Sequence, residues 1–167
     1  SDLGWNYRMP EFNAAIALAQ LENARKLQQL RIDSASIFLD VMNETDFLIP
    51  QKIPEHSTHS FYTLGVKYKG KENIGVTWQD FRKAYVDAGG DGIYGAWSIP
   101  YLEPVMLDKK YIKHYPELYS QISYEEGICP VAEKIQAELM QFKTNYRDLS
   151  LAKSKAKILK KVINKFS

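Results

Sequence analysis

Three polar residues suited to binding an anion stand together near the start of the chain. Asn6, Tyr7 and Arg8 directly precede a segment of helical spacing that begins at Pro10. An arginine can grip phosphate or carboxylate through a bidentate fork, and an amide adds a further donor. The cluster therefore predicts contact with an anionic ligand. A helix cap beside a surface arginine is the alternative reading of the same residues.

The other reactive side chains form no comparable group in the sequence. His56 and His59 make an H-x-x-H pair in an expected loop. That pair is a weak metal signal, and a surface or substrate-contact role is the alternative. Cys129 has no partner base near it in the sequence, so we interpret it as structural. The run Gly89–Gly92 lacks the spacing of a Walker or dinucleotide motif and predicts a turn.

Composition and charge narrow the possible functions. The 167 residues carry a formal net charge of only +2, which argues against a dedicated nucleic-acid binder. Six lysines in the tail beyond Arg147 are interpreted as the solvated face of a last helix, and nucleic-acid or membrane-surface binding is the less favoured alternative. The single cysteine excludes an intrachain disulfide and indicates a reducing, cytoplasmic compartment. No apolar stretch approaches the roughly 20 residues that span a bilayer.

Helices and short strands are expected to position these residues. Apolar spacing predicts a long helix over 10–43, roughly 50 Å if straight, which is longer than a small domain needs. Further helices are expected over 77–88, with Thr77 as N-cap, over 130–139 and from Ser150 to the end. Strands are expected over 60–67, 93–97 and 140–143, with a polar turn over 69–73 and an irregular stretch over 100–104. This order predicts a small α+β or α/β layer, with a two-layer sandwich as the outcome.

The wording of the first segment resembles a known family. Gly4-x-Asn6-Tyr7-Arg8-Met9, followed by Ala14-Ala15-Ile16 and Gln20-Leu21, is similar to a stretch of the DegT/StrS sugar aminotransferases. His59-Ser60-Phe61-Tyr62 resembles the start of that family's small-domain strand. Cys129-Pro130-Val131-Ala132-Glu133 resembles its late helix start. Because the start of the sequence also lacks an initiating Met and a signal peptide, we expect a C-terminal portion of a longer protein.

The resemblance implies a fold and a set of roles. The fold would be the small C-terminal domain of a type I aminotransferase, with a long interdomain helix followed by a small antiparallel sheet packed by helices. Residues 1–43 would hold the end of the large domain and that helix, and residues 44–167 the small domain. Asn6 would bind the phosphate of pyridoxal phosphate in the partner subunit, and Tyr7, Arg8, His59 and Tyr101 would contact substrate. Relatives commonly carry Leu-His-x-x-Pro where Tyr101 takes the histidine position, which leaves the substrate's identity open.

The resemblance also implies a reaction. The parent protein would be a cytoplasmic homodimer that uses pyridoxal phosphate to move an amino group from an amino acid, glutamate for preference, to a nucleotide-linked keto sugar. The Schiff-base lysine and the aspartate facing the pyridine nitrogen belong to motifs upstream of Asn6, so no catalytic residue and no metal site is assigned in this chain. The chain alone is expected to be inactive. Two alternatives stay open: a sugar dehydratase, in which histidine replaces that lysine, and a non-catalytic binding or regulatory module.

Overall fold

The computed structural model describes residues 7–109, 116–119 and 121–167 of the chain. The strands are β1 (Leu48–Pro50), β2 (Leu64–Tyr68), β3 (Tyr94–Gly95) and β4 (Leu139–Phe142). The helices are α1 (Glu11–Met42), α2 (Gly70–Asn73), α3 (Trp78–Asp87), α4 (Pro104–Leu107), α5 (Pro116–Tyr119), α6 (Pro130–Gln136) and α7 (Leu149–Phe166), with one 3₁₀ turn, η1 (Pro100–Leu102). The expected mixture of helices with a small antiparallel sheet is confirmed.

The local signals of two predicted helices explain where those helices begin and end. Thr77 caps α3 as expected, because its hydroxyl accepts a hydrogen bond from the Asp80 amide at 3.2 Å. Gly89 ends α3 with a φ of +92°, a left-handed conformation that glycine adopts without a steric penalty. Asp148 caps α7 by accepting from the Ser150 amide at 2.8 Å. The cap expected at Thr77 is therefore confirmed, and Asp148, which the sequence analysis did not single out, caps the last helix in the same way.

Several predicted boundaries were wrong. The strand expected from Ser60 starts only at Leu64, because Phe61 has a φ of +49° and interrupts the extended backbone. The polar turn over 69–73 contains the short helix α2, and the irregular stretch over 100–104 contains η1. The helix expected over 130–139 ends at Gln136, because Leu139 already belongs to β4. The short helices α4 and α5 were not predicted.

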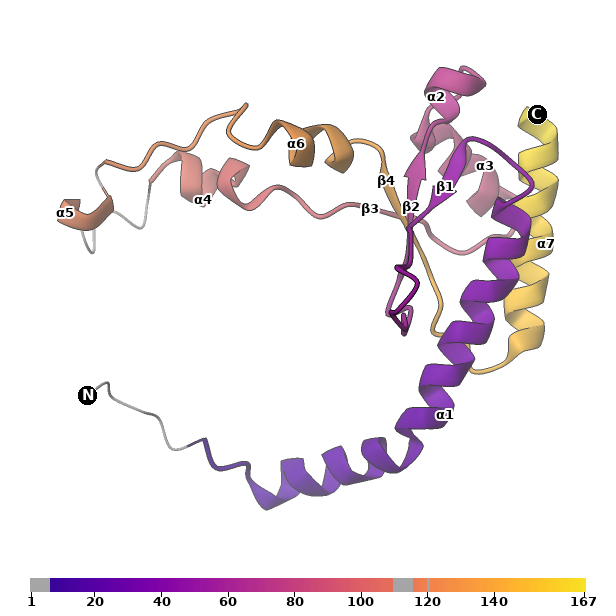
Figure 1. Ribbon diagram of the computed structural model, residues 1–167, viewed down its shortest axis with the longest axis horizontal. Coiled ribbons are helices and arrows are strands. Elements are labelled where there is room, and N and C mark those ends of the chain that lie inside the picture. Colours follow the sequence, from indigo (N-terminus) through magenta and orange to yellow (C-terminus); the bar gives the residue numbers. More distant parts are fainter. Residues whose placement is uncertain (1–6, 110–115, 120) are drawn as a thin grey trace.

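The four strands form one antiparallel sheet in the order β1-β2-β4-β3. The register pairs Val66 of β2 with Met140 of β4, and Gly95 of β3 also pairs with Met140. Burial alternates along β2 and β4, as expected for strands with one covered face. The second half of α1, α3 and α7 lie on the covered side, and the other face of the sheet is open (Figure 1).

The core fills the space between the sheet and these helices. Phe38 of α1 stands 6.1 Å from the ring of Phe142 and 6.1 Å from that of Tyr146. Along α7, Leu159 and Val162 are buried, whereas Leu151 is exposed. The other buried positions of α7 are Ala152, Ala156 and Ile163. Small alanine side chains let α7 approach α1 closely, which a search for large apolar residues overlooks.

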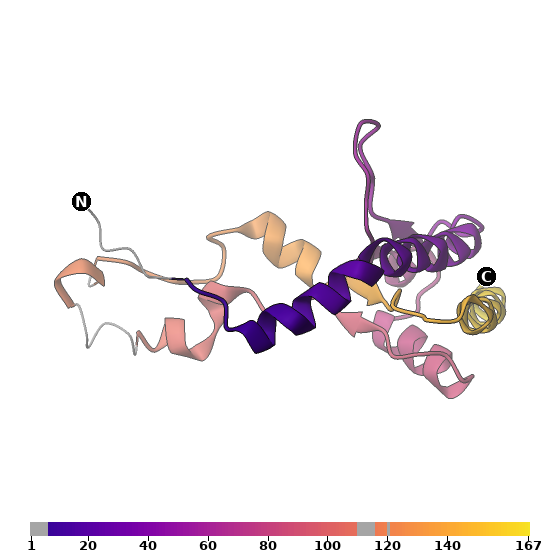
Figure 2. The ribbon, with the colours of Figure 1, turned by 90° about the horizontal axis from the view of Figure 1, so that it is seen from below.

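Two parts of the chain leave this packed body. The first half of α1 runs outward, and the segment that carries η1, α4, α5 and α6 extends on the same side of the molecule (Figure 1). Figure 2 shows that the connection between β1 and β2 also projects from the body as a narrow loop. Among the helices of the described ranges, none combines the length and apolar character that crossing a membrane requires.

Candidate functional site

The predicted N-terminal cluster lies at the far end of the outgoing helix. Asn6 falls outside the described residues, so its expected cofactor contact stays a prediction. Tyr7 is 88% exposed and Arg8 is also exposed, and both precede the first turn of α1. No described element of this chain covers them. Any ligand held there would need a second surface facing the same side chains.

His59 is built into the loop that leads to β2. Its Nδ1 accepts a hydrogen bond from the Phe61 amide at 3.0 Å, and its Nε2 lies 2.7 Å from the amide nitrogen of Gln51. The ring also meets the Phe61 ring edge-on at 4.5 Å between centroids. Both ring nitrogens thus have protein neighbours, and in this arrangement His59 holds the loop. Its expected contact with substrate stays a prediction.

The same loop carries a strained residue. Phe61 is buried with a φ of +49°, a left-handed conformation that is costly for an aromatic residue. It persists because its neighbours fix it from both sides: His59 holds its N–H, and the buried Thr144 hydroxyl donates to its carbonyl oxygen at 2.6 Å. The strained conformation is thus held by tertiary contacts rather than by local preference.

Tyr101 belongs to a separate group of hydrogen bonds on the outgoing segment. Its hydroxyl donates to Glu133 and accepts from the Cys129 amide at 3.2 Å. Burial, and then the bond to Glu133, raise the pKa of Tyr101 to about 12, so the hydroxyl remains protonated. Glu133 also accepts from the Gly127 amide at 2.9 Å, and the bonds from Tyr101 and Gly127 hold its pKa below the usual range. Tyr101 thus ties η1 to the start of α6.

The predicted site residues do not meet one another in this chain. No hydrogen bond, ion pair or ring contact joins any two of Tyr7, Arg8, His59 and Tyr101 within the described ranges. The described part of the chain also offers no group of three or more metal-ligating side chains. His56 and His59 therefore have no third ligand there. What the chain offers instead is a concave surface along one edge of the sheet.

This sheet-edge hollow has a volume of about 550 Å³. Its aromatic wall consists of Tyr62, Tyr94 and Trp97, and the last is 86% exposed. Its polar residues come from four parts of the chain: Arg31 from α1, Thr63 from the loop before β2, Gln141 from β4, and Lys143, Thr144 and Asn145 from the segment after β4. Exposed aromatic rings can stack on planar groups of a ligand. Cations beside those rings can neutralise its phosphates. The hollow is therefore suited to an aromatic, negatively charged ligand.

Arg31 is the best-ordered cation of the hollow. Its Nη1 donates to the Tyr62 carbonyl oxygen at 2.9 Å and approaches the Thr144 hydroxyl at 3.4 Å. Its guanidinium carbon lies 5.6 Å from the centre of the Tyr62 ring. These contacts connect α1, the strained loop and the segment after β4. Arg31 therefore fixes the hollow's shape and supplies charge to it.

Sequence reasoning missed most of these residues. Arg31 sits in the middle of a helix and shows no motif. The aromatics Tyr94 and Trp97 were interpreted only as strand formers. The run from Lys143 to Arg147 gave no signal either, because the alternation of exposed residues with the buried Thr144 and Tyr146 is seen only in the structure. That alternation indicates an extended segment with one row of polar side chains on its open side.

Comparison with known proteins gives both a family and a fold. The model of the DegT/DnrJ/EryC1/StrS aminotransferase family matches residues 1–153. An aminotransferase of Helicobacter pylori involved in the biosynthesis of pseudoaminic acid, PseC, has a similar structure, with a TM-score of 0.69 at 14% identity. The GDP-4-keto-6-deoxy-D-mannose-3-dehydratase of E. coli, solved with hydrated pyridoxal phosphate, gives a TM-score of 0.65 at 18% identity.

The coverage of these comparisons is unequal. The alignments include 99% and 93% of this chain but only 40% and 36% of the two solved proteins. The chain thus spans about two fifths of the length of each. A search of curated protein sequences finds no match.

Proposed function

The chain belongs to the DegT/DnrJ/EryC1/StrS aminotransferase family, and from this we propose that it forms the C-terminal part of a pyridoxal-phosphate-dependent sugar aminotransferase. The proposed enzyme is a cytoplasmic homodimer that transfers the amino group of glutamate to a nucleotide-linked keto sugar. The observation that carries the proposal is the family match, which covers residues 1–153 of the 167.

The sheet-edge hollow supports a nucleotide-linked substrate. A nucleotide sugar combines a planar base with a diphosphate, and the hollow combines exposed aromatic rings with the cations Arg31 and Lys143. Its volume of about 550 Å³ lies in the range of small-molecule sites. The strained loop at Phe61 and the ordered Arg31 give this surface a fixed shape, which lowers the entropic cost of binding.

The described residues do not provide the lysine that the cofactor needs. A lysine that forms a Schiff base must be desolvated enough to lose its proton near neutral pH. No lysine of the described ranges is buried. Lys69 and Lys83 are in the opposite situation, because the hydrogen bonds that they donate to Glu72 and Asp87 respectively raise their pKa. We therefore place the covalent attachment of pyridoxal phosphate outside the described residues and assign no catalytic step to them.

A dehydratase is the second candidate, because a sugar 3-dehydratase is among the similar structures, with an alignment over 93% of this chain. The two reactions differ in the product. An aminotransferase consumes glutamate and returns an amino sugar, whereas a dehydratase removes a hydroxyl group from the sugar. A non-catalytic module would give neither product.

The test uses the protein expressed from the complete reading frame that encodes this chain. We expect it to convert glutamate and a nucleotide-linked keto sugar into 2-oxoglutarate and an amino sugar, measured by mass spectrometry across a panel of such sugars. A deoxy sugar without nitrogen would identify the dehydratase instead. No product with any sugar, despite bound cofactor, would contradict both enzymes.

Two substitutions test the roles assigned near the N-terminus. In the complete protein, Asn6→Ala should weaken cofactor retention by about 1.5–3 kcal/mol, the value of a hydrogen bond to a charged group. Arg8→Ala should mainly raise the KM for the sugar. Asn13→Ala and Arg25→Ala, both at exposed positions of α1, are the matched controls. Cofactor affinity and kinetics that equal those of the controls would remove both assignments.

A further inference from the structure

The segment after β4 presents a row of polar side chains. Along residues 143–147 burial alternates strictly: Thr144 and Tyr146 are buried, and the three residues between and beside them are exposed. Successive side chains of an extended backbone point to opposite sides, so Lys143, Asn145 and Arg147 share the open side. The buried pair anchors the segment. Thr144 donates to the Phe61 carbonyl oxygen at 2.6 Å, and the Tyr146 hydroxyl donates to Asp91.

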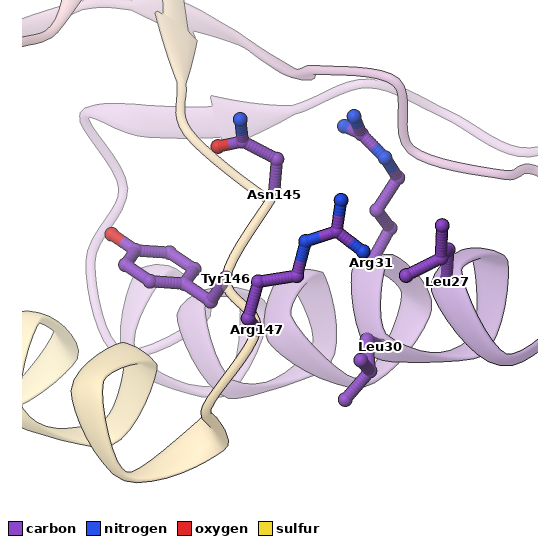
Figure 3. Close-up of a pocket in the computed structure, with 6 residues that line it drawn as sticks. All are labelled: Leu27, Leu30, Arg31, Asn145, Tyr146 and Arg147. Carbon is purple, nitrogen blue, oxygen red and sulfur yellow. The ribbon is translucent and has the colours of Figure 1, made fainter. Parts of the chain in front are cut away.

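A small cavity lies where this row meets α1. It has a volume of about 110 Å³ and is lined by Leu27, Leu30 and Arg31 of α1 and by Asn145, Tyr146 and Arg147. Figure 3 shows the guanidinium groups of Arg31 and Arg147 on the same side of the α1 ribbon, with the amide of Asn145 to one side of them. The leucines give the cavity an apolar wall on the helix side.

Neither arginine has a carboxylate partner among the residues that the structure describes. Some lysines of the described residues do have such partners: Lys67 lies 3.2 Å from Glu138, and Lys160 lies 2.7 Å from Glu44. In the part of the chain that the structure describes, neither Arg31 nor Arg147 forms an ion pair with a carboxylate. Two cations that line one small cavity repel each other, and an apolar wall weakens the screening by water. An anion between them would turn that repulsion into attraction.

We propose that this cavity is an oxyanion site, which binds one phosphate or carboxylate group of a small ligand. Planar guanidinium groups recognise such anions through paired N–H donors, and the Asn145 amide adds another. Arg31 is already oriented by its bonds to the Tyr62 carbonyl oxygen and the Thr144 hydroxyl, so little order is lost on binding. The volume of about 110 Å³ suits a single oxyanion group, while the adjacent sheet-edge hollow, which shares Arg31 and Asn145, could hold the rest of the ligand.

The experiment measures anion binding to the 167-residue chain by calorimetry at constant ionic strength. Inorganic phosphate and glutamate are titrated separately, with chloride as the ionic background. Arg147→Gln should weaken binding about tenfold or more, because a charge-assisted hydrogen bond and a unit of charge are lost together. Arg147→Lys keeps the charge but loses the paired N–H donors of the guanidinium group. Its anion affinity should lie between those of the Arg147→Gln variant and the unaltered chain.

Arg25→Gln is the matched control, since it removes the same charge from an exposed position of α1 that does not line the cavity. It should bind both anions like the unaltered chain. Tighter binding of phosphate assigns the site to a phosphate group, and tighter binding of glutamate assigns it to a carboxylate. Absence of binding, or equal affinities in the Arg147→Gln and Arg25→Gln variants, would overturn the proposal. A thermal melt of each variant confirms that the comparison is made on folded protein.

Discussion

The packed layer of the molecule and its outlying segments follow different rules. We define the packed layer as residues 34–50, 61–93 and 140–167, and the outlying segments as the described residues 7–33 and 94–139, leaving aside the projecting connection over 51–60. Every core residue lies in the packed layer. None of residues 7–33, 94–109 or 121–139 is buried. The outlying segments nevertheless carry large apolar side chains, among them Phe12 at 75% and Val131 at 70% exposure.

Helix α1 runs through both regions. It therefore allows helix formation and burial to be compared within one helix. Its backbone is helical from Glu11 to Met42, yet its buried residues begin only at Ser34. The backbone is thus helical on both sides of Ser34, whereas burial depends on what lies beside the helix. Exposed apolar stripes of this size usually have a partner. The chain spans about two fifths of the solved relatives, so the remaining length of such a protein, or a second copy, is available as that partner.

The largest difference in stability between the two regions is expected for substitutions at Phe38 and Phe12. Phe38→Ala removes a fully buried ring between Phe142 and Tyr146, and we expect it to lower the free energy of unfolding by about 3–5 kcal/mol. Phe12→Ala makes the same chemical change on the outlying half of α1 and should cost less than about 0.5 kcal/mol. Urea unfolding of the two variants measures both values. Equal losses would show that the two halves of the helix are packed alike.

The buried tyrosines of the packed layer should make the stability of the chain depend on pH in the alkaline range. Burial, followed by the charge of Asp80, raises the pKa of Tyr68 to about 12, and burial also raises the pKa of Tyr85 and Tyr146. An unfolded tyrosine loses its proton near pH 10, so above that pH the folded state binds more protons than the unfolded state. Stability should therefore be fully present below about pH 10 and fall as the pH rises above it.

Unfolding curves recorded at a series of pH values measure this effect. Tyr68→Phe should make the decline above pH 10 shallower, because one proton-linked group is gone, although it also removes the bond to the Val76 carbonyl oxygen at 3.0 Å. Tyr94→Phe, at an exposed position of β3, is the control and should leave the slope unchanged. A flat stability profile up to pH 12 would contradict the burial of these hydroxyl groups.

A smaller effect is expected at the cap of α3. Thr77→Ala removes the acceptor for the Asp80 amide and should cost about 1 kcal/mol. Thr58→Ala, in the exposed connection between β1 and β2, is the matched control and should be neutral. Chemical denaturation compares the two variants. A neutral Thr77→Ala would mean that water satisfies the first turn of α3 equally well.

Features of the fold differed in how well the sequence predicted them, according to whether local or distant residues determine them. Features set by neighbours in the sequence were predicted. They are the length of α1, the N-cap of α3 at Thr77 and the end of α3 at Gly89. Features set by distant contacts were not. The start of β2 depends on how His59 and Thr144 hold Phe61, and Thr144 is 83 residues away. Arg31 could not be placed in a site from its helix alone, because its partners are Tyr62 and Thr144.

The candidate site was predicted in part, for the same reason. A resemblance in wording singled out Asn6 through Arg8 and His59, and the match to the family confirmed the membership. The resemblance did not indicate that these residues lie apart from one another in the described part of the chain. The sheet-edge hollow depends on the pairing of β3 with β4, which brings Tyr94 opposite Gln141. Pairing between strands so far apart in sequence has no local signal.

The smallest effect on stability, and the last test of the comparison, concerns the exposed stripe of α1. Phe12, Ile16 and Leu21 are all exposed in the described chain. We expect the double variant Phe12→Ala/Ile16→Ala to unfold within about 0.5 kcal/mol of the unaltered chain, because no core contact is lost. The same variant should self-associate less in sedimentation experiments, because apolar area is removed from the surface that would pair.

Asn13→Ala is the control, since it lies on the same exposed turn of α1 and leaves the apolar stripe intact. It should match the unaltered chain in both measurements. The two readouts separate the possible failures. A loss of stability comparable to that of Phe38→Ala would place the stripe inside the folded chain. A strict monomer at high concentration, with no binding of a dye for exposed apolar surface, would show that the stripe needs no partner. A change in association alone would identify the outlying half of α1 as a surface prepared for contact, and the packed layer as the part that folds without it.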